Sequence, residues 1–95
     1  MYKILLMACG NVDHMENPYD NIVNGIKVHK SLKTCESIKE CQEIAKKYID
    51  TNNLGSGNWN GGAVYDDYGN QIGYVSYNGR YWEKGSKYYL KINLV

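Results

Sequence analysis

The spacing of apolar residues in the first third of the chain predicts two strands. Tyr2 to Cys9 is a short, almost continuous apolar run that ends at Gly10-Asn11, as is typical of a central strand. After the turn dipeptide Asn24-Gly25, apolar and polar positions alternate from Ile26 to Lys33, so we expect a second strand to leave this turn. The pattern leaves open whether Ile22-Val23 pairs back across the turn.

From Thr34 onward the spacing becomes that of one amphipathic helix. Apolar positions recur three and four residues apart while charged residues fill the other side. The apolar positions are Ile38, Cys41, Ile44, Ala45, Tyr48 and Ile49. Both Thr34 and Ser37 fit as the N-cap, the latter with Glu40 as its capping-box partner. We expect the helix to end near Asn52-Asn53, with Gly55 available for a left-handed cap.

Beyond Gly55, turn residues separate short strand-like segments, which predicts an antiparallel meander. These segments are Gly62–Asp66, Gln71–Tyr77, Arg80–Glu83 and Lys87–Val95. Asn78-Gly79 is the strongest hairpin signal and predicts a type I′ turn. Together the elements predict a single α+β domain over residues 1–95, of order ββαββββ, in which one helix packs on a mostly antiparallel sheet.

Composition and length exclude several classes of protein. The chain has 95 residues, which is the size of one small domain, and its formal net charge of +1 gives no strong general field for nucleic acid or membrane. Leu6-Met7-Ala8-Cys9 looks like the end of a lipoprotein signal, but the apolar stretch before it is too short. We therefore expect a soluble cytoplasmic protein with no membrane partner.

The cysteines, histidines and glycines offer little catalytic chemistry. Three cysteines, an odd number, predict free and mostly buried thiols, and the spacings Cys9–His14 and Cys35–Cys41 match no zinc pair. A constellation of Cys9, His14 and Asp13 can be drawn, but residues adjacent in sequence are rarely arranged as nucleophile, base and orienter. We expect no catalytic residue, no metal and no cofactor.

Two loops are candidates for binding. Asn11–Asn21 is polar and long, and is either a binding loop or a mere connector. Gly55–Gly62 is rich in glycine but follows a helix and opens a strand, the reverse of a phosphate-binding fingerprint. Asn58, Trp59 and Asn60 would form the tip of a recognition loop; alternatively, the glycines serve only a helix cap and a bulge.

The aromatic content of the C-terminal half is the feature that most favours an interaction surface. The chain has ten Tyr and no Phe, and Tyr combines a stiff apolar ring with a polar tip that tolerates half-exposure. The candidate contacts with a protein partner are Trp59, Tyr77, Arg80, Tyr81 and Trp82. The alternative is a small nucleic-acid-binding domain that uses Arg80, Lys84, Lys87 and Lys91. A homodimer through an open sheet edge is compatible with both.

The chain as a whole resembles the small accessory proteins of bacteriophages and mobile elements, anti-CRISPR proteins among them. It shares with them a single domain, a composition rich in Asn, Tyr, Lys and Ile, and an aromatic surface. The resemblance implies a non-enzymatic inhibitor that binds a host defence complex, of the CRISPR-Cas kind, and blocks it sterically. It is a resemblance of type and not of motif, so no residue role is carried over.

Overall fold

The computed structural model of the protein describes residues 1–85 and has the α+β architecture that the sequence predicts. Its elements are β1 (Tyr2–Leu6), the 3₁₀ helix η1 (Val12–His14), β2 (Ile22–Val23), β3 (Ile26–Lys27), β4 (Ser31–Cys35), α1 (Ile38–Thr51), β5 (Ala63–Tyr65), β6 (Gln71–Val75) and β7 (Tyr81–Glu83). The last predicted strand, Lys87–Val95, lies outside the described residues.

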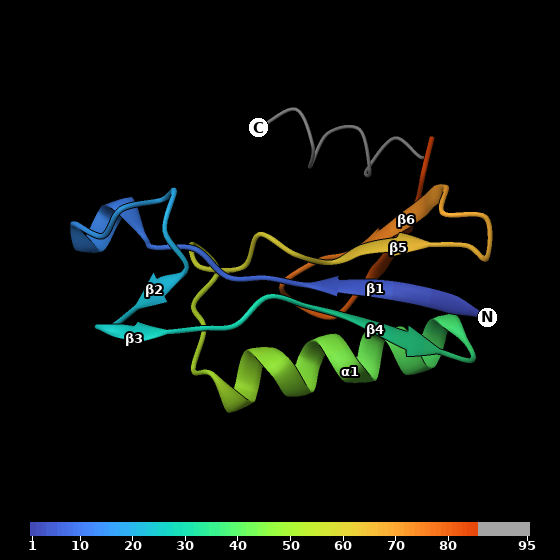
Figure 1. Cartoon of the computed structure of the whole chain (residues 1–95), viewed down its shortest axis with the longest axis horizontal. Helices are drawn as coiled ribbons and strands as arrows, with labels where there is room; N and C mark the ends of the chain where they lie inside the picture. Colours follow the sequence, from blue (N-terminus) through green and yellow to red (C-terminus); the bar gives the residue numbers. More distant parts are fainter. Residues whose placement is uncertain (86–95) are drawn as a thin grey trace.

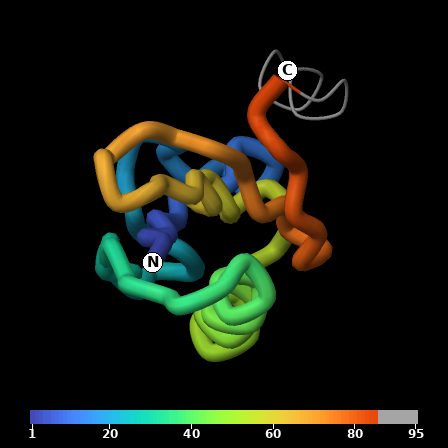
Figure 2. The backbone as a smooth tube through the Cα atoms, turned by 90° about the vertical axis from the view of Figure 1, so that its right-hand side faces the viewer, coloured from blue at the N-terminus to red at the C-terminus, as the bar shows by residue number. Residues whose placement is uncertain are grey.

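The main sheet has five antiparallel strands in the order β4-β1-β5-β6-β7, and β2 and β3 form a separate two-stranded sheet (Figure 1). Figure 2 looks along α1, which lies on one side of the strands. β1 is central because its apolar run pairs with β4 on one side and with β5 on the other. Within residues 1–85, the predicted packing of one α-helix on an antiparallel sheet is therefore confirmed.

The core forms where α1 meets one face of the sheet. The helix buries Cys41, Ala45 and Ile49, which are four residues apart and so lie along one stripe. On the facing strand β1, the alternate residues Ile4 and Leu6 are also buried. Helical and strand periodicity thus place two apolar surfaces against each other, and removal of this area from water stabilises the fold.

At its first end α1 uses one of the two predicted N-caps, and at its other end the left-handed residue is not the predicted glycine. The N-cap is Ser37, whose Oγ accepts a hydrogen bond from the Glu40 backbone N–H at 3.1 Å, while Thr34 belongs to β4. At the other end the left-handed residue is Asn53, with φ of 52°, and not Gly55. Asn tolerates this conformation because its short polar side chain bonds locally.

The Asn24-Gly25 turn joins two strands rather than starting one long strand. Asn24 and Gly25 both have positive φ, 52° and 79°, as a type I′ turn requires. Ile22-Val23 therefore does pair back across the turn, against Ile26-Lys27. The alternating segment expected to be one strand is divided into β3 and β4, because β3 pairs with β2 whereas β4 pairs with β1.

The prediction of a type I′ turn at Asn78-Gly79 is wrong. Of these two residues only Gly79 has positive φ, 85°. The backbone N–H of Gly79 donates to Ser76 O at 2.9 Å, and that of Ser76 donates to Arg80 O at 2.9 Å. The connection between β6 and β7 is therefore a three-residue loop with glycine in its left-handed position, for which an Asn-Gly pair is equally suited.

The expectation of free thiols is wrong for two of the three cysteines. Cys35 and Cys41 form a disulfide, with a Cα–Cα distance of 5.7 Å, between the end of β4 and the first turns of α1. Both are buried. Cys9 is free and half-buried. Because disulfides are typical of oxidising compartments, this bridge does not support the expected cytoplasmic location.

Gly62 is a position where the fold requires glycine. Its φ is +104°, and a Cβ there would overlap the carbonyl oxygen of Val75. Gly69 also has positive φ, +83°, but a Cβ there would meet nothing within 4 Å. Substitution of each glycine in turn therefore separates the cost of backbone strain, which both positions share, from the cost of steric overlap, which arises only at Gly62.

We expect Gly62→Ala to lower the free energy of unfolding by about 3 kcal/mol or more, because strain and overlap add. The control Gly69→Ala should lower it by only about 1 kcal/mol, from strain alone. Urea denaturation measures both variants. Equal losses for the two would show that the approach of Gly62 to β6 is not as close as described.

Candidate interaction site

The carboxylate of Glu16 fixes the loop between β1 and β2. Its Oε1 accepts a hydrogen bond from the Asn11 backbone N–H at 3.0 Å, and its Oε2 accepts one from the Asn24 backbone N–H at 2.6 Å. These two bonds are the main reason that the pKa of Glu16 is held below its ordinary value. One side chain therefore ties the start of the loop to the tip of the β2–β3 hairpin.

Further hydrogen bonds order the loop internally. The Asn11 side-chain oxygen accepts from the Asp13 backbone N–H at 3.0 Å and so caps η1. At the base of the loop, the Gly10 backbone N–H donates to Asp20 O at 2.9 Å. The chain from Gly10 to Asp20 is thus closed at its base and braced across its middle, in the manner of an Ω-loop.

This braced loop and the adjoining hairpin expose a group of large apolar side chains. We call this group the loop surface; it consists of Val12, Met15, Tyr19, Ile22 and Ile26. Met15 is 97% exposed and Tyr19 is 94% exposed. In Figure 1 the loop and the β2–β3 hairpin lie at one end of the molecule, and the β5–β6 turn lies at the other. The register places Ile22 and Ile26 on opposite faces of the hairpin, because Val23 is the residue that pairs with Ile26. Large apolar side chains exposed on an ordered loop are typical of an interaction site.

The loop also carries negative charge. Residues 11–20 contain Asp13, Glu16 and Asp20 and no Lys or Arg. The remainder of the chain has eleven Lys and Arg against seven Asp and Glu, so it is positive. The overall charge of +1 therefore conceals an acidic end, which would attract a basic partner surface.

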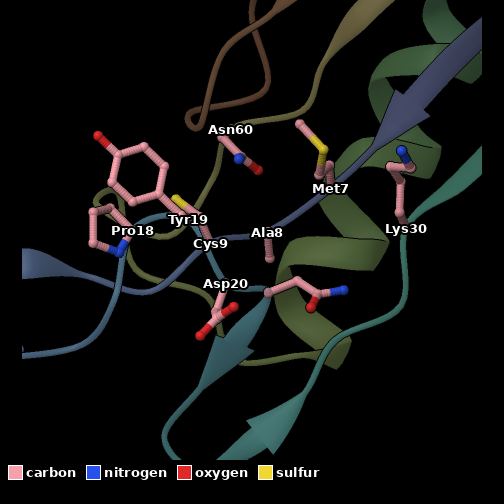
Figure 3. Close-up of a pocket in the computed structure, with 9 residues that line it drawn as sticks. Met7, Ala8, Cys9, Pro18, Tyr19, Asp20, Lys30 and Asn60 are labelled. Carbon is pink, nitrogen blue, oxygen red and sulfur yellow. The ribbon is translucent and has the colours of Figure 1, made fainter.

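A small cleft adjoins the loop and is shown in Figure 3. Its lining residues are Met7, Ala8, Cys9, Pro18, Tyr19, Asp20, Asn21, Lys30 and Asn60. The Cys9 thiol donates to Gly57 O at 3.7 Å, and burial raises its pKa. The thiol is therefore protonated near neutral pH, which disfavours nucleophilic chemistry. Neither Asp13 nor His14 is among the described residues that line the cleft.

Between residues 1 and 85, no three or more His, Cys, Asp and Glu side chains are grouped so that they could hold a metal ion. In the same residues, no helix has the length and apolar character needed to cross a membrane.

Trp59 is not available as a contact with a partner, contrary to the sequence prediction. The side chain is only 7% exposed, and its indole Nε1 donates to Val75 O at 3.0 Å. Its ring lies 5.9 Å from that of Tyr48 on α1. Trp59 therefore belongs to the core, because an indole can bury its rings when its N–H finds a carbonyl.

The recognition-loop interpretation of Gly55–Gly62 is also wrong for Asn58, which is buried like Trp59. Asn58 is buried, with its amide donating to Cys9 O at 3.0 Å and its side-chain oxygen accepting from the Gly55 backbone N–H at 3.0 Å. The segment runs beside the chain that follows β1, where Ala8 pairs with Trp59. Of the three predicted tip residues only Asn60 is exposed, and it lines the cleft.

The other four predicted contacts do not form one surface. The Tyr77 hydroxyl donates to Leu54 O at 3.1 Å, which ties it to the chain after α1. The register places Tyr81 opposite the core residue Val75, and Trp82 one position along, on the other face. Arg80 is exposed in the β6–β7 loop. Tyr81 and Trp82 are half-buried.

The face of the sheet opposite α1 does carry aromatic side chains. The paired positions place Tyr65, Tyr74 and Trp82 there, away from the buried Val64. Burial raises the pKa of the Tyr74 hydroxyl. Some tyrosines therefore point away from the helix, although these side chains are only partly exposed.

The four basic residues of the nucleic-acid alternative are only partly described. Arg80 and Lys84 are both exposed. Lys87 and Lys91 lie outside the described residues. The alternative stays a prediction.

The loop surface was not predicted from the sequence. Asn11–Asn21 was a candidate binding loop, but no contact residue was predicted within it. The available signal was the presence of Val12, Met15 and Tyr19 in a segment otherwise made of polar and turn residues. Their exposure depends on the path of the loop, which the spacing does not show.

Comparison with protein-family models, with curated proteins and with solved structures finds no match to this chain.

The burial of Trp59 predicts a structural phenotype. Trp59→Phe removes the hydrogen bond to Val75 O and leaves space in the core, so we expect the free energy of unfolding to fall by about 2 kcal/mol. Urea denaturation measures this loss. Tyr68→Ala, at a side chain that is 90% exposed, is the control and should change stability by at most about 0.5 kcal/mol. An unchanged stability of Trp59→Phe would contradict the core assignment.

The raised pKa of Cys9 predicts slow alkylation. Only the thiolate reacts, and a higher pKa means less thiolate at any pH below it. In the native protein the rate of reaction with a maleimide should therefore reach half its maximum above the value of about 8.5 found for an ordinary cysteine. The same protein unfolded in urea without reductant is the control and should return to the ordinary value. A native midpoint at or below that value would contradict the burial of the thiol.

Proposed function

We propose that this protein is a non-enzymatic protein-binding module that acts by occupying a surface of its partner. The observation that carries the proposal is the near-complete exposure of Met15 and Tyr19 on a loop that Glu16 fixes through two backbone hydrogen bonds. An ordered loop loses little conformational freedom on binding, so its apolar side chains contribute more of their burial energy to affinity.

The chemistry of the loop surface indicates what it contacts. Tyr and Met are enriched at the buried centres of interfaces, and Tyr is frequent among the residues that dominate binding energy. Asp13 and Asp20 are exposed beside these side chains. The partner surface is therefore proposed to hold an apolar depression surrounded by basic residues, since opposite charges speed association and favour one orientation.

We further propose that the partner belongs to a host defence complex and that binding blocks it sterically. This part rests on the resemblance to bacteriophage accessory proteins. A basic partner surface is the kind that holds a nucleic acid backbone, and occupation of it by an acidic loop would exclude the nucleic acid.

An inhibitor of this kind would act in the cytoplasm, so it has to work without the disulfide between Cys35 and Cys41. The cytoplasm keeps thiols reduced. The proposal therefore requires the loop surface to keep its structure when Cys35 and Cys41 are reduced. Residues 11–26, which carry the loop surface, do not include either cysteine.

Substitution of Tyr19 tests the proposal. A tagged protein is used to recover partners from a bacterial lysate, with and without nuclease and with reductant present. We expect a stoichiometric protein that survives nuclease treatment, and we expect Tyr19→Ala to weaken its binding by about tenfold or more. Tyr68→Ala is the matched control, because Tyr68 is equally exposed but lies in the β5–β6 turn at the other end of the molecule.

Three outcomes would contradict the proposal. Equal losses for Tyr19→Ala and Tyr68→Ala would show that the loop surface is not the contact. A loss only with Arg80→Ala or Trp82→Ala would move the contact to the β6–β7 hairpin. Recovery that nuclease abolishes, and that weakens steeply with salt, would indicate direct binding of nucleic acid.

A further inference from the structure

The outer edge of β4 is open to another strand. The main sheet ends at β4, and within residues 1–85 no strand pairs with its outer side. Three consecutive residues of this strand, Leu32, Lys33 and Thr34, are exposed. An edge strand directs alternate backbone N–H and C=O groups outward, where a further strand can pair with them. β4 thus presents a pairing edge of five residues.

A hollow adjoins this edge on each face of the sheet. The hollow opposite α1 is lined by Leu5, Lys30, Ser31, Leu32 and Tyr65. The hollow on the helix side is lined in part by Leu6, Lys33, Ile44, Lys47 and Tyr48. Successive side chains of a strand point to opposite faces. A strand added to β4 would therefore direct neighbouring side chains into the two hollows in turn.

Both hollows combine apolar walls with positive charge. Lys30 lines the first, and Lys33 and Lys47 line the second. No Asp or Glu is among the described residues that line either hollow. The edge therefore favours a segment that has apolar residues for the hollows and carboxylates for the lysines.

The central lysine disfavours a second copy of this chain as the occupant. If two β4 strands paired antiparallel about their central residue, Lys33 would lie directly opposite Lys33 of the second copy. Like charges directly opposite each other destabilise a strand pair. A lysine in an edge strand is a common guard against self-association, and the same lysine attracts an acidic segment.

We propose that the outer edge of β4 binds an extended segment of a partner protein by strand addition, and that this segment carries two adjacent apolar residues between two acidic residues. Backbone hydrogen bonds to β4 hold the segment, the apolar pair fills the two hollows, and the carboxylates pair with Lys30 and Lys33. This edge is separate from the loop surface in sequence, so either interaction can fail without the other.

A labelled peptide tests the proposal directly. The probe is a capped peptide of sequence Thr-Thr-Glu-Val-Ile-Glu-Thr, titrated with the full-length protein by fluorescence polarisation. Two further peptides are N-methylated, one at the odd and one at the even positions within its central five residues. Because only alternate N–H groups of an added strand face β4, one methylated peptide should lose binding and the other should keep it.

Charge reversal on the protein provides the second readout. Lys33→Glu should weaken binding of the unmodified peptide by about fivefold, because an attraction becomes a repulsion. Lys84→Glu makes the same charge change beyond β7, at the opposite edge of the sheet, and should alter the affinity less than about twofold. Tyr19→Ala should leave the peptide affinity unchanged, which separates this test from that of the loop surface.

Four results would overturn the proposal. The first is an absence of binding up to about 1 mM peptide. The second is equal binding by the two methylated peptides. The third is an equal loss with Lys33→Glu and Lys84→Glu. The fourth is a concentration-dependent dimer in sedimentation that the unmodified peptide dissociates, since the occupant of the edge would then be a second copy.

Discussion

Burial of the apolar stripe of α1 against one face of the sheet determines where every other feature of the molecule lies. Cys41, Ala45 and Ile49 occupy that face together with Ile4 and Leu6 of β1. Once the helix takes this face, strand alternation sends the aromatic residues of β5, β6 and β7 partly to the other. The disulfide from Cys41 to β4 then holds the start of the helix on the edge strand.

The antiparallel pairing of β1 with β4 creates the loop surface. The chain has to turn back between these two strands, and it does so through a long connection instead of a tight turn. Within that connection the Glu16 carboxylate replaces the regular backbone pairing that a strand would provide. The exposed side chains of Met15 and Tyr19 are therefore carried by a braced scaffold, which is the arrangement that gives loops their binding specificity.

The sequence predicted the elements whose signal is local and missed those that depend on distant contacts. The helix followed from its period, and the Asn24-Gly25 turn from its need for positive φ. The burial of Trp59 could not be predicted, because it depends on Val75 O, which is 16 residues away and on a different strand. The Cys35–Cys41 bridge was missed because an odd cysteine count was taken to indicate free thiols. The candidate contacts were placed on the aromatic half from residue types alone, and residue types do not show which aromatic side chains the fold buries.

The two proposed surfaces have opposite chemical character, and this follows from how the charges divide. Residues 11–20 hold only acidic charges, whereas the β4 edge and the hollows beside it present lysines. A net charge of +1 suggests a protein with no electrostatic preference, but the separation of the charges gives each surface its own. A partner that offers a basic depression to the loop and an acidic extended segment to β4 would meet both surfaces in one orientation only. Charge separation of this kind selects a partner by its pattern more than by the strength of any single contact.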